Sequence, residues 1–216
     1  MTMKIKLIMI SIATIGIAVG CGPSQTRETG PGSGTRSVTV KGSDTMVHLV
    51  TTWAENYMKA NIGADVSVTG GGSGTGIAAL LNGTTDICAA SREMTAEEKA
   101  QATQKGITPK ETVVARDGIA VIVHPSNPVN ELTIEQLKKI YTGAAEDWSQ
   151  FGGPTGSIVV LSRESSSGTY VFFQEHVLKK EDYTPKARLM AATSAIIQSV
   201  SEDGQAIGYV GLGYAL

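Results

Sequence analysis

The chain has 216 residues, of which 41% are hydrophobic, 18% charged and 5% aromatic. This length and apolar content suffice for one globular domain or two small ones with hydrophobic cores. The formal net charge of −2 gives no electrostatic support for nucleic-acid binding, so nucleic acid is excluded as a predicted partner.

Residues 1–21 predict a bacterial lipoprotein signal peptide that is not part of the fold. Lys4 and Lys6 precede an uncharged apolar stretch over 7–19, which is too short to span a bilayer as a mature helix. The stretch leads into Ala18-Val19-Gly20-Cys21, which resembles a lipobox whose cysteine is lipidated. The alternative is an ordinary cleaved signal with a chance cysteine. We therefore expect an extracytoplasmic protein anchored to the membrane through Cys21.

Residues 22–37 (GPSQTRETGPGSGTRS) contain no large apolar side chain and are rich in Gly, Ser, Pro and Thr. This composition is typical of a flexible linker, so we expect a tether between the membrane and the folded part.

The first half of the remaining chain alternates between short β-type runs and helical patterns. Thr95 and Glu98 form a capping-box pattern at the start of the third helix. The β-α-β-α-β-α order predicts a mainly parallel α/β sheet. The expected strands are 38–40, 66–68 and 87–90, and the expected helices are about 45–59, a segment containing 77–81, and about 95–105.

The second half starts with two adjacent strand-like runs, joined by Arg116-Asp117-Gly118 as a domain crossover. A second capping box at Thr133 and Gln136 opens a helix that Gly143 ends. The pattern predicts two α/β lobes, 38–116 and 117–216. The other expected elements are strands at 112–115, 118–123, 157–161 and 206–210, a loop over 148–156, and helices starting near 169 and at 194–200.

Small hydroxyl-bearing turns recur where an expected strand passes into a helix. Glycines let the backbone approach an oxygen closely, Ser and Thr donate through hydroxyls, and arginine offers a bidentate fork for a tetrahedral oxyanion. Ligands of open parallel sheets bind at the carboxyl ends of the strands. Each turn alone is explained as a capped helix start, but the set with its two arginines predicts an anion site. The turns are 41–45 (KGSDT), 70–76 (GGGSGTG), 91–94 (SREM) and 163–169 (RESSSGT).

Other functions that use glycine or serine turns fit less well. The segment 74–79 matches G-x-G-x-x-A, but it follows the second strand rather than the first, and no lysine completes a nucleotide phosphate loop. A serine hydrolase using Ser73 or Ser167 needs a base, and the three histidines have neither an evident role nor metal-ligand spacing. We expect no catalytic residue, metal or cofactor, and a buried structural role for Cys88.

At these turns the chain resembles the phosphate-binding proteins of bacterial ABC phosphate transporters (PstS type), which have the class II periplasmic-binding-protein fold. The resemblance covers about 38–216. Arg163 with Ser167-Gly168-Thr169 is similar to the family's R-x-x-x-S-G-T phosphate segment. Ser73, the 43–45 turn and the segment from Asp86 to Arg92 match further phosphate-contacting segments. The phosphate site that the resemblance implies comprises Asp44, Thr45, Ser73, Ser91, Arg92, Arg163, Ser167, Gly168 and Thr169.

Arg92 stands where some family members carry aspartate, which leaves open the residue that accepts the proton of hydrogen phosphate. A carboxylate that accepts this proton discriminates against sulfate, which has no proton to donate. Asp44 is one candidate acceptor; its alternative role is to cap the first helix.

The resemblance implies an α/β, two-lobed class II fold that ends short of the family's C-terminus, leaving both lobes incomplete. It also implies a monomeric, lipid-anchored binding protein that captures inorganic phosphate and delivers it to ABC permease subunits. The alternatives are a binding protein for sulfate or molybdate, an exported serine hydrolase or phosphatase, and a surface sensor or adhesion domain.

Overall fold

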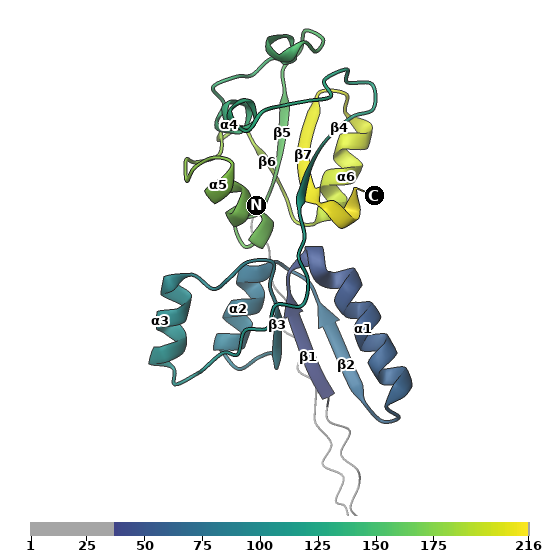
Figure 1. Cartoon of the computed structure of the whole chain (residues 1–216), viewed down its shortest axis with the longest axis vertical. Helices are drawn as coiled ribbons and strands as arrows, with labels where there is room; N and C mark the ends of the chain where they lie inside the picture. The colour runs from purple at the N-terminus through teal and green to yellow at the C-terminus, as the bar shows by residue number, and fades with distance from the viewer. Residues whose placement is uncertain (1–36, 216) are drawn as a thin grey trace, which may run out of the picture. The chain divides into compact units, whose positions relative to one another are not determined.

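The computed structural model describes residues 37–215, which form two β-sheets with flanking helices (Figure 1). The predicted signal peptide, the lipidation site at Cys21 and residues 22–36 of the predicted tether lie outside the described residues. None of the described helices is long and apolar enough to cross a membrane.

The first sheet has the strand order β2-β1-β3, and all its strands are parallel, as the β-α alternation predicts. Its elements are β1 (Ser37–Gly42), the 3-10 turn η1 (Asp44–Met46), α1 (Val47–Ala60), β2 (Asp65–Thr69), α2 (Ser73–Leu81), β3 (Ile87–Ala89) and α3 (Ala96–Gln104).

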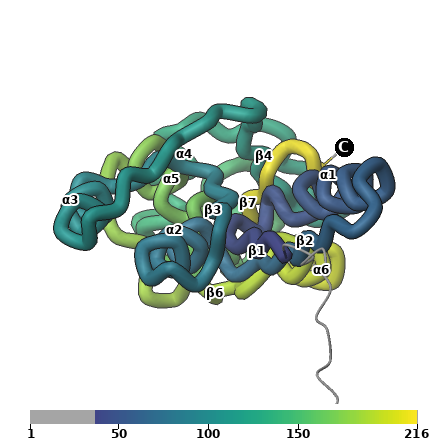
Figure 2. The backbone as a smooth tube through the Cα atoms, turned by 90° about the horizontal axis from the view of Figure 1, so that it is seen from below, coloured from purple at the N-terminus to yellow at the C-terminus, as the bar shows by residue number. Residues whose placement is uncertain are grey.

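Helices α1 and α2 flank this sheet from different sides (Figure 2). Gly76 lets α2 approach β1 closely, because a Cβ there would lie 2.5 Å from Lys41 O and from Gly42 Cα. Ile77 and Leu81 pack with Ala102 in a small core between α2 and α3. This packing holds the first turn of α2 against the end of β1.

The second sheet has the order β4-β7-β5-β6 and is mixed, because β4 runs antiparallel to β7 whereas β5 is parallel to both β7 and β6. Its elements are β4 (Ile119–Val123), α4 (Ile134–Thr142), η2 (Trp148–Phe151), β5 (Val159–Arg163), α5 (Gly168–His176), β6 (Arg188–Met190), α6 (Thr193–Glu202), β7 (Ala206–Gly211) and η3 (Leu212–Tyr214).

The largest core of the described residues lies beside the second sheet. Tyr141, Trp148 and Phe173 are fully buried there, and the rings of Phe173 and Tyr209 stack with centroids 4.2 Å apart. Burial of each large side chain contributes roughly 2–3 kcal/mol. This core supports the carboxyl end of β5 and the start of α5, the two elements on either side of the 163–169 turn.

The two capping boxes and the glycine stop that the sequence predicts are confirmed. Thr95 and Thr133 each form a complete capping box, with Glu98 and Gln136 respectively. Gly143 ends α4 in the left-handed conformation, with φ of 80°.

The predicted strand at 112–115 is wrong. Val113 and Val114 are 76% and 53% exposed, and the segment pairs with no strand of the described chain. β-Branched residues favour extended backbone, but a strand also requires a neighbour to bond. The sequence pattern also placed β5 two residues too early, missed the three-residue β6, and missed the 3-10 turn in the expected loop at 148–156.

Candidate functional site

The turn that follows β1 is held by bonds to the other two strand ends of the first sheet. Ser43 N donates to Ala89 O at 2.8 Å, and Gly72 N donates to Gly42 O at 3.0 Å. The carboxyl ends of β1, β2 and β3 therefore converge, as expected for parallel strands. Thr45 lies in this turn, and its Oγ1 is 2.7 Å from Ser43 Oγ.

Ser73, the first residue of α2, is completely buried. Its Oγ accepts a hydrogen bond from Ser91 N at 3.0 Å, and the two serine hydroxyls are 3.1 Å apart. The glycine turn and the turn after β3 thus share one hydroxyl pair. The sequence predicts both serines as site residues, and the structure brings them together.

The turn after β5 contacts the same place from the second sheet. Gly74 N donates to Ser166 O at 2.9 Å. Gly168, the first residue of α5, lies so close to the Ser73 and Ser91 hydroxyls that a Cβ at this position would overlap both. Ser167 accepts from Tyr170 N at 3.4 Å as the N-cap of α5, and Thr169 is buried. The N-terminal turns of α2 and α5 therefore meet at two small residues.

Arg163, the last residue of β5, is only 2% exposed and is held by four hydrogen bonds. Its Nε donates to Met190 O at 3.1 Å, and Nη1 donates to Thr193 Oγ1 at 3.0 Å. Nη2 donates to Ala191 O at 2.9 Å and to Asp44 Oδ2 at 2.5 Å. Four of its five N–H groups are thus already paired.

Asp44 does not cap the first helix, so that predicted alternative is wrong. Neither η1 nor α1 has a side-chain cap. The Asp44 carboxylate instead accepts from Gly71 N at 2.8 Å and from Arg163. Gly71 has a φ of 112°, a conformation that favours glycine, and in this turn its N–H faces the Asp44 carboxylate.

Arg92 is paired with a residue that the sequence analysis did not single out for the site, Glu98. Arg92 Nη1 and Nη2 donate to the two Glu98 carboxylate oxygens, both at 2.8 Å, and Nη1 also donates to Glu93 O at 2.8 Å. The hydrogen bonds from Arg92 lower the pKa of Glu98. The capping-box motif of α3 identifies Glu98 in the sequence, but no sequence pattern predicts its ion pair with Arg92.

Cys88 lies in β3 beside this pair. Its pKa is raised to about 11, chiefly because burial disfavours the thiolate, while the Arg92 charge opposes the shift. Cys88 is half-buried rather than buried, so the predicted burial is wrong, because the short strand β3 leaves part of the side chain accessible. No group of three or more His, Cys, Asp or Glu residues in the described part of the chain could hold a metal ion.

A hydroxyl network behind β5 was not predicted. Tyr209 OH is 2.8 Å from Ser162 Oγ and 3.0 Å from Tyr183 OH, and Tyr183 OH donates to Tyr170 O at 3.0 Å. Tyr209 OH also accepts from Arg163 N at 3.4 Å. These residues come from β7, β5, α5 and the loop after α5, and they fix the backbone on both sides of the 163–169 turn. Tyrosine spacing alone carries no signal for such a network.

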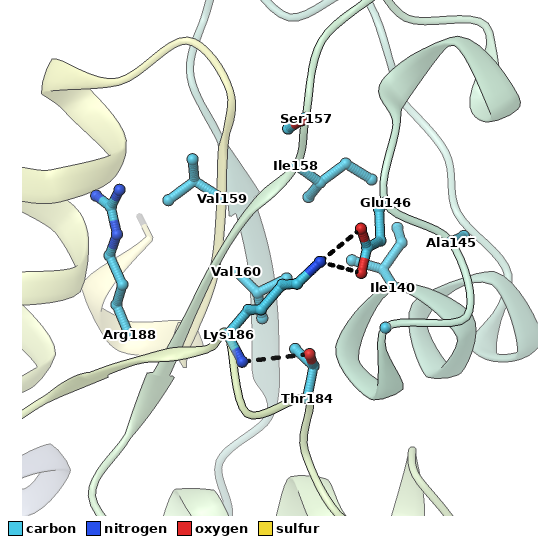
Figure 3. Close-up of a pocket in the computed structure, with 11 residues that line it drawn as sticks. Ile140, Ala145, Glu146, Ser157, Ile158, Val159, Val160, Thr184, Lys186 and Arg188 are labelled. Atoms are coloured by element: carbon cyan, nitrogen blue, oxygen red, sulfur yellow. Dashed lines mark hydrogen bonds and ion pairs between the residues drawn. The ribbon is translucent and has the colours of Figure 1, made fainter.

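A cavity of about 220 Å³ lies elsewhere, between the end of α4 and the start of β5 (Figure 3). Lys186 Nζ donates to both carboxylate oxygens of Glu146 at its rim, at 2.7 and 2.8 Å. Val160 and Ile140 line the cavity, and none of the predicted site residues does.

The family model for a PBP superfamily domain matches residues 27–216 of this chain. A phosphate-binding protein PstS from Pseudomonas aeruginosa is 32% identical over 98% of this chain and 72% of its own length. A protein of the same name from Staphylococcus saprophyticus is 39% identical, and the match covers 90% of this chain but only 60% of the relative.

The chain is also similar to solved structures of proteins named for phosphate transport. A putative phosphate ABC transporter substrate-binding protein from Clostridium perfringens, solved with bound phosphate, superposes with a TM-score of 0.77 and 37% identity. The match covers 83% of this chain and 72% of that one. An ABC-type phosphate transport receptor from Vibrio cholerae gives a TM-score of 0.61 and 32% identity, covering 82% of this chain and 71% of that one.

Proposed function

The chain belongs to the PBP superfamily and, within it, to the family of PstS-type phosphate-binding proteins, and from this premise we propose that it binds inorganic phosphate outside the cytoplasm for an ABC importer. The ligand would lie among the four turns that the sequence analysis singled out. Binding and release, with no chemical step, is the whole of the proposed activity.

The observation that carries this proposal is the meeting of the α2 and α5 N-termini at Ser73 and Gly168, with Ser91 between them. Backbone N–H groups at a helix start lack intrahelical acceptors and carry partial positive charge, so an anion is stabilised there. Two such helix starts, the hydroxyl groups of Ser73 and Ser91, and the guanidinium groups of Arg92 and Arg163 match the donor requirement of a tetrahedral oxyanion.

Phosphate is favoured over sulfate because Asp44 supplies a carboxylate beside Arg163. Each carboxylate oxygen has two lone pairs, and one pair of each is occupied by Gly71 N–H or by Arg163. A lone pair remains for the proton of hydrogen phosphate, whereas a sulfate oxygen would meet an acceptor with nothing to donate. In this proposal Asp44 has two roles, as the partner of Arg163 and as the proton acceptor.

The remaining parts of the proposal concern how the protein is placed in the cell. The lipobox at Cys21 would anchor it to the membrane, and residues 22–37 would let the folded part reach permease subunits. Two of the relatives described above carry ABC phosphate transport in their names. A monomer suffices, because one chain carries all four turns.

A serine hydrolase is the alternative from another class. Its best nucleophile, Ser73, is paired with Ser91, and the three histidines contact other residues of the described chain: His48 packs on Tyr214, His124 bonds Ser126 and His176 packs on Phe172. A general base at Ser73 is therefore lacking among the described residues.

The decisive experiment is a calorimetric titration of the purified protein with phosphate, sulfate and molybdate. We expect saturable binding of phosphate, on the order of micromolar, and weaker binding of sulfate and molybdate. If sulfate or molybdate binds more tightly than phosphate, that anion, and not phosphate, is the ligand of this protein. Turnover of a chromogenic phosphate ester that Ser73→Ala abolishes would support the hydrolase.

A further inference from the structure

The sequence motif points to Arg163 as the main guanidinium of the site, but the hydrogen bonds of the two arginines differ in an unexpected way. Four of the five N–H groups of Arg163 donate hydrogen bonds to other parts of the protein. Arg92 donates three hydrogen bonds, two to the Glu98 carboxylate and one to the carbonyl of Glu93. The arginine with more unpaired donors is therefore Arg92.

The unpaired donors of Arg92 lie on one edge of its guanidinium. Glu98 binds end-on, through Nη1 and Nη2. The Nε–H and the second Nη2–H point in parallel along the side-on edge, which is the other geometry in which arginine grips an oxyanion with two bonds. The Nε atom is buried and has no hydrogen-bond partner in the described part of the chain. A buried N–H without an acceptor is destabilising, so an anionic oxygen at this edge would be stabilised.

Nη2, one of the two atoms of this edge, lies next to the glycine turn. A Cβ on Gly74 would be 3.6 Å from Arg92 Nη2 and 3.2 Å from Ser166 O. Ser166 O accepts the Gly74 N–H at the start of α2, so a carbonyl oxygen occupies the position of an acceptor there. An incoming oxyanion would replace this carbonyl once the 165–167 turn moves away, and it would reach the Gly74 N–H and Arg92 together.

We propose that Glu98 is a positioning residue: it holds Arg92, already a member of the implied phosphate site, so that the side-on edge of the guanidinium forms the bidentate fork for phosphate. This inference rests on the proposed phosphate function. Glu98 is suited to the role because it is itself fixed: its Oε2 accepts from Thr95 N at 2.8 Å, and Glu98 N donates to Thr95 Oγ1. The capping box of α3 therefore sets the orientation of Arg92.

Two pairs of matched variants test the proposal by calorimetry with inorganic phosphate. Arg92→Lys keeps the positive charge but loses the fork, and we expect it to weaken phosphate binding about 10- to 100-fold. Arg188→Lys is the control, because Arg188 is exposed on β6 and lines the separate cavity rather than the proposed site. Glu98→Gln keeps a capping-box residue at this position but loses the charge, and we expect about 3- to 10-fold weaker binding. Glu97→Gln, on the same helical turn, is its control.

The positioning role is tested by combining the variants. If Glu98 acts through Arg92, Glu98→Gln adds no further loss in the Arg92→Lys background, whereas independent roles would give additive losses and overturn the positioning role. Nuclear magnetic resonance of the wild-type protein gives a readout that does not depend on any variant folding. The Arg92 Nε–H signal, assigned by its disappearance in Arg92→Lys, should shift when phosphate saturates the protein.

The outcomes separate this inference from the function on which it rests. If the wild-type protein does not bind phosphate, the proposed function fails and the fork fails with it. If the wild-type protein binds phosphate while its Arg92 Nε–H signal stays unchanged, or Arg92→Lys binds as Arg188→Lys does, only the fork is refuted.

Discussion

Arg163 Nη2 donates to Asp44 Oδ2, which joins the end of β5 in the second sheet to the turn after β1 in the first, 119 positions earlier in the chain. Asp44 also accepts from Gly71 N. One carboxylate thus links the glycine turn of the first sheet to the arginine of the second. The pair belongs to the proposed site and to the contact between the two sheets, so substitutions here should change binding and stability together.

Arg163→Ala should abolish measurable phosphate binding and also destabilise the protein. It removes a buried cation of the proposed site, leaves Thr193 Oγ1 without the Arg163 donor, and leaves Asp44 with only the Gly71 N–H. Removal of one partner of a largely buried ion pair costs about 3 kcal/mol. Denaturant unfolding measures the free-energy loss, and calorimetry measures binding. Arg188→Ala, an exposed arginine, is the control and should change neither quantity; wild-type affinity in Arg163→Ala would remove Arg163 from the site.

Asp44→Asn should reduce the preference for phosphate over sulfate. The asparagine oxygen can still accept from Gly71 N–H, but its NH₂ group cannot accept the proton of hydrogen phosphate. We expect the ratio of sulfate to phosphate dissociation constants to fall about tenfold. Competition titrations of both anions against the variant measure this ratio. Asp65→Asn, at the exposed start of β2, is the control. An unchanged ratio would restrict Asp44 to its pairing with Arg163.

Much of the fold was predictable because its signals are local. Both capping boxes and the glycine stop of α4 are short motifs whose bonds lie within one turn of helix. The predicted strand at 112–115 is wrong and the three residues of β6 were missed, because pairing depends on neighbours that the local pattern does not specify. β6 is a strand because β5 bonds it from 188 to 190.

The sequence predicted which residues of the candidate site would lie together, but not how they pair. Ser73 and Ser91 were expected at strand ends of one sheet, and the parallel topology brings them within 3.1 Å. The acidic partners of the two arginines were not predicted. Asp44 lies 119 positions from Arg163 in the chain. Arg92 lies in the loop between β3 and α3, and the sequence does not show that this loop turns its guanidinium toward Glu98. Charges pair according to the tertiary fold, and the spacing of residues along the chain does not determine which acid meets which base.

The Arg92–Glu98 pair should make stability depend on pH in the acid range. Because hydrogen bonds from Arg92 lower the pKa of Glu98 in the folded state, its contribution is complete above the pKa of an unfolded glutamate, about 4.3. The contribution is lost as pH falls through the lower folded value. The difference in unfolding free energy between wild type and Glu98→Gln should therefore shrink from pH 6 to pH 3. The same series with Glu111→Gln, an exposed residue, should show a smaller change.

Cys88 should react slowly with thiol reagents in the native protein. Burial raises its pKa to about 11, so about one thousandth of it is thiolate at pH 8, against about a quarter for an ordinary cysteine. In a Cys21→Ser chain, where Cys88 is the only thiol, alkylation by iodoacetamide should be roughly 100-fold slower than in urea-unfolded protein. Equal rates would mean that the thiol is exposed and ionised.

Gly168→Ala should weaken phosphate binding at least tenfold through its effect on the meeting point of the two helix starts. The added methyl group would overlap the hydroxyls of Ser73 and Ser91, so either the serines rotate or α5 moves away, and both changes break the donor arrangement. Gly213→Ala is the matched control, because a Cβ at Gly213 meets nothing within 4 Å and its φ is not in the left-handed region. Calorimetry should show at least a tenfold loss of affinity for Gly168→Ala and none for Gly213→Ala.

The two variants should have similar circular dichroism, because the clash at Gly168 can be relieved by a local shift at the first residue of α5. If Gly168→Ala binds phosphate as tightly as the wild type, the ligand does not lie between Ser73 and the start of α5, and the anion site must be sought at another of the turns.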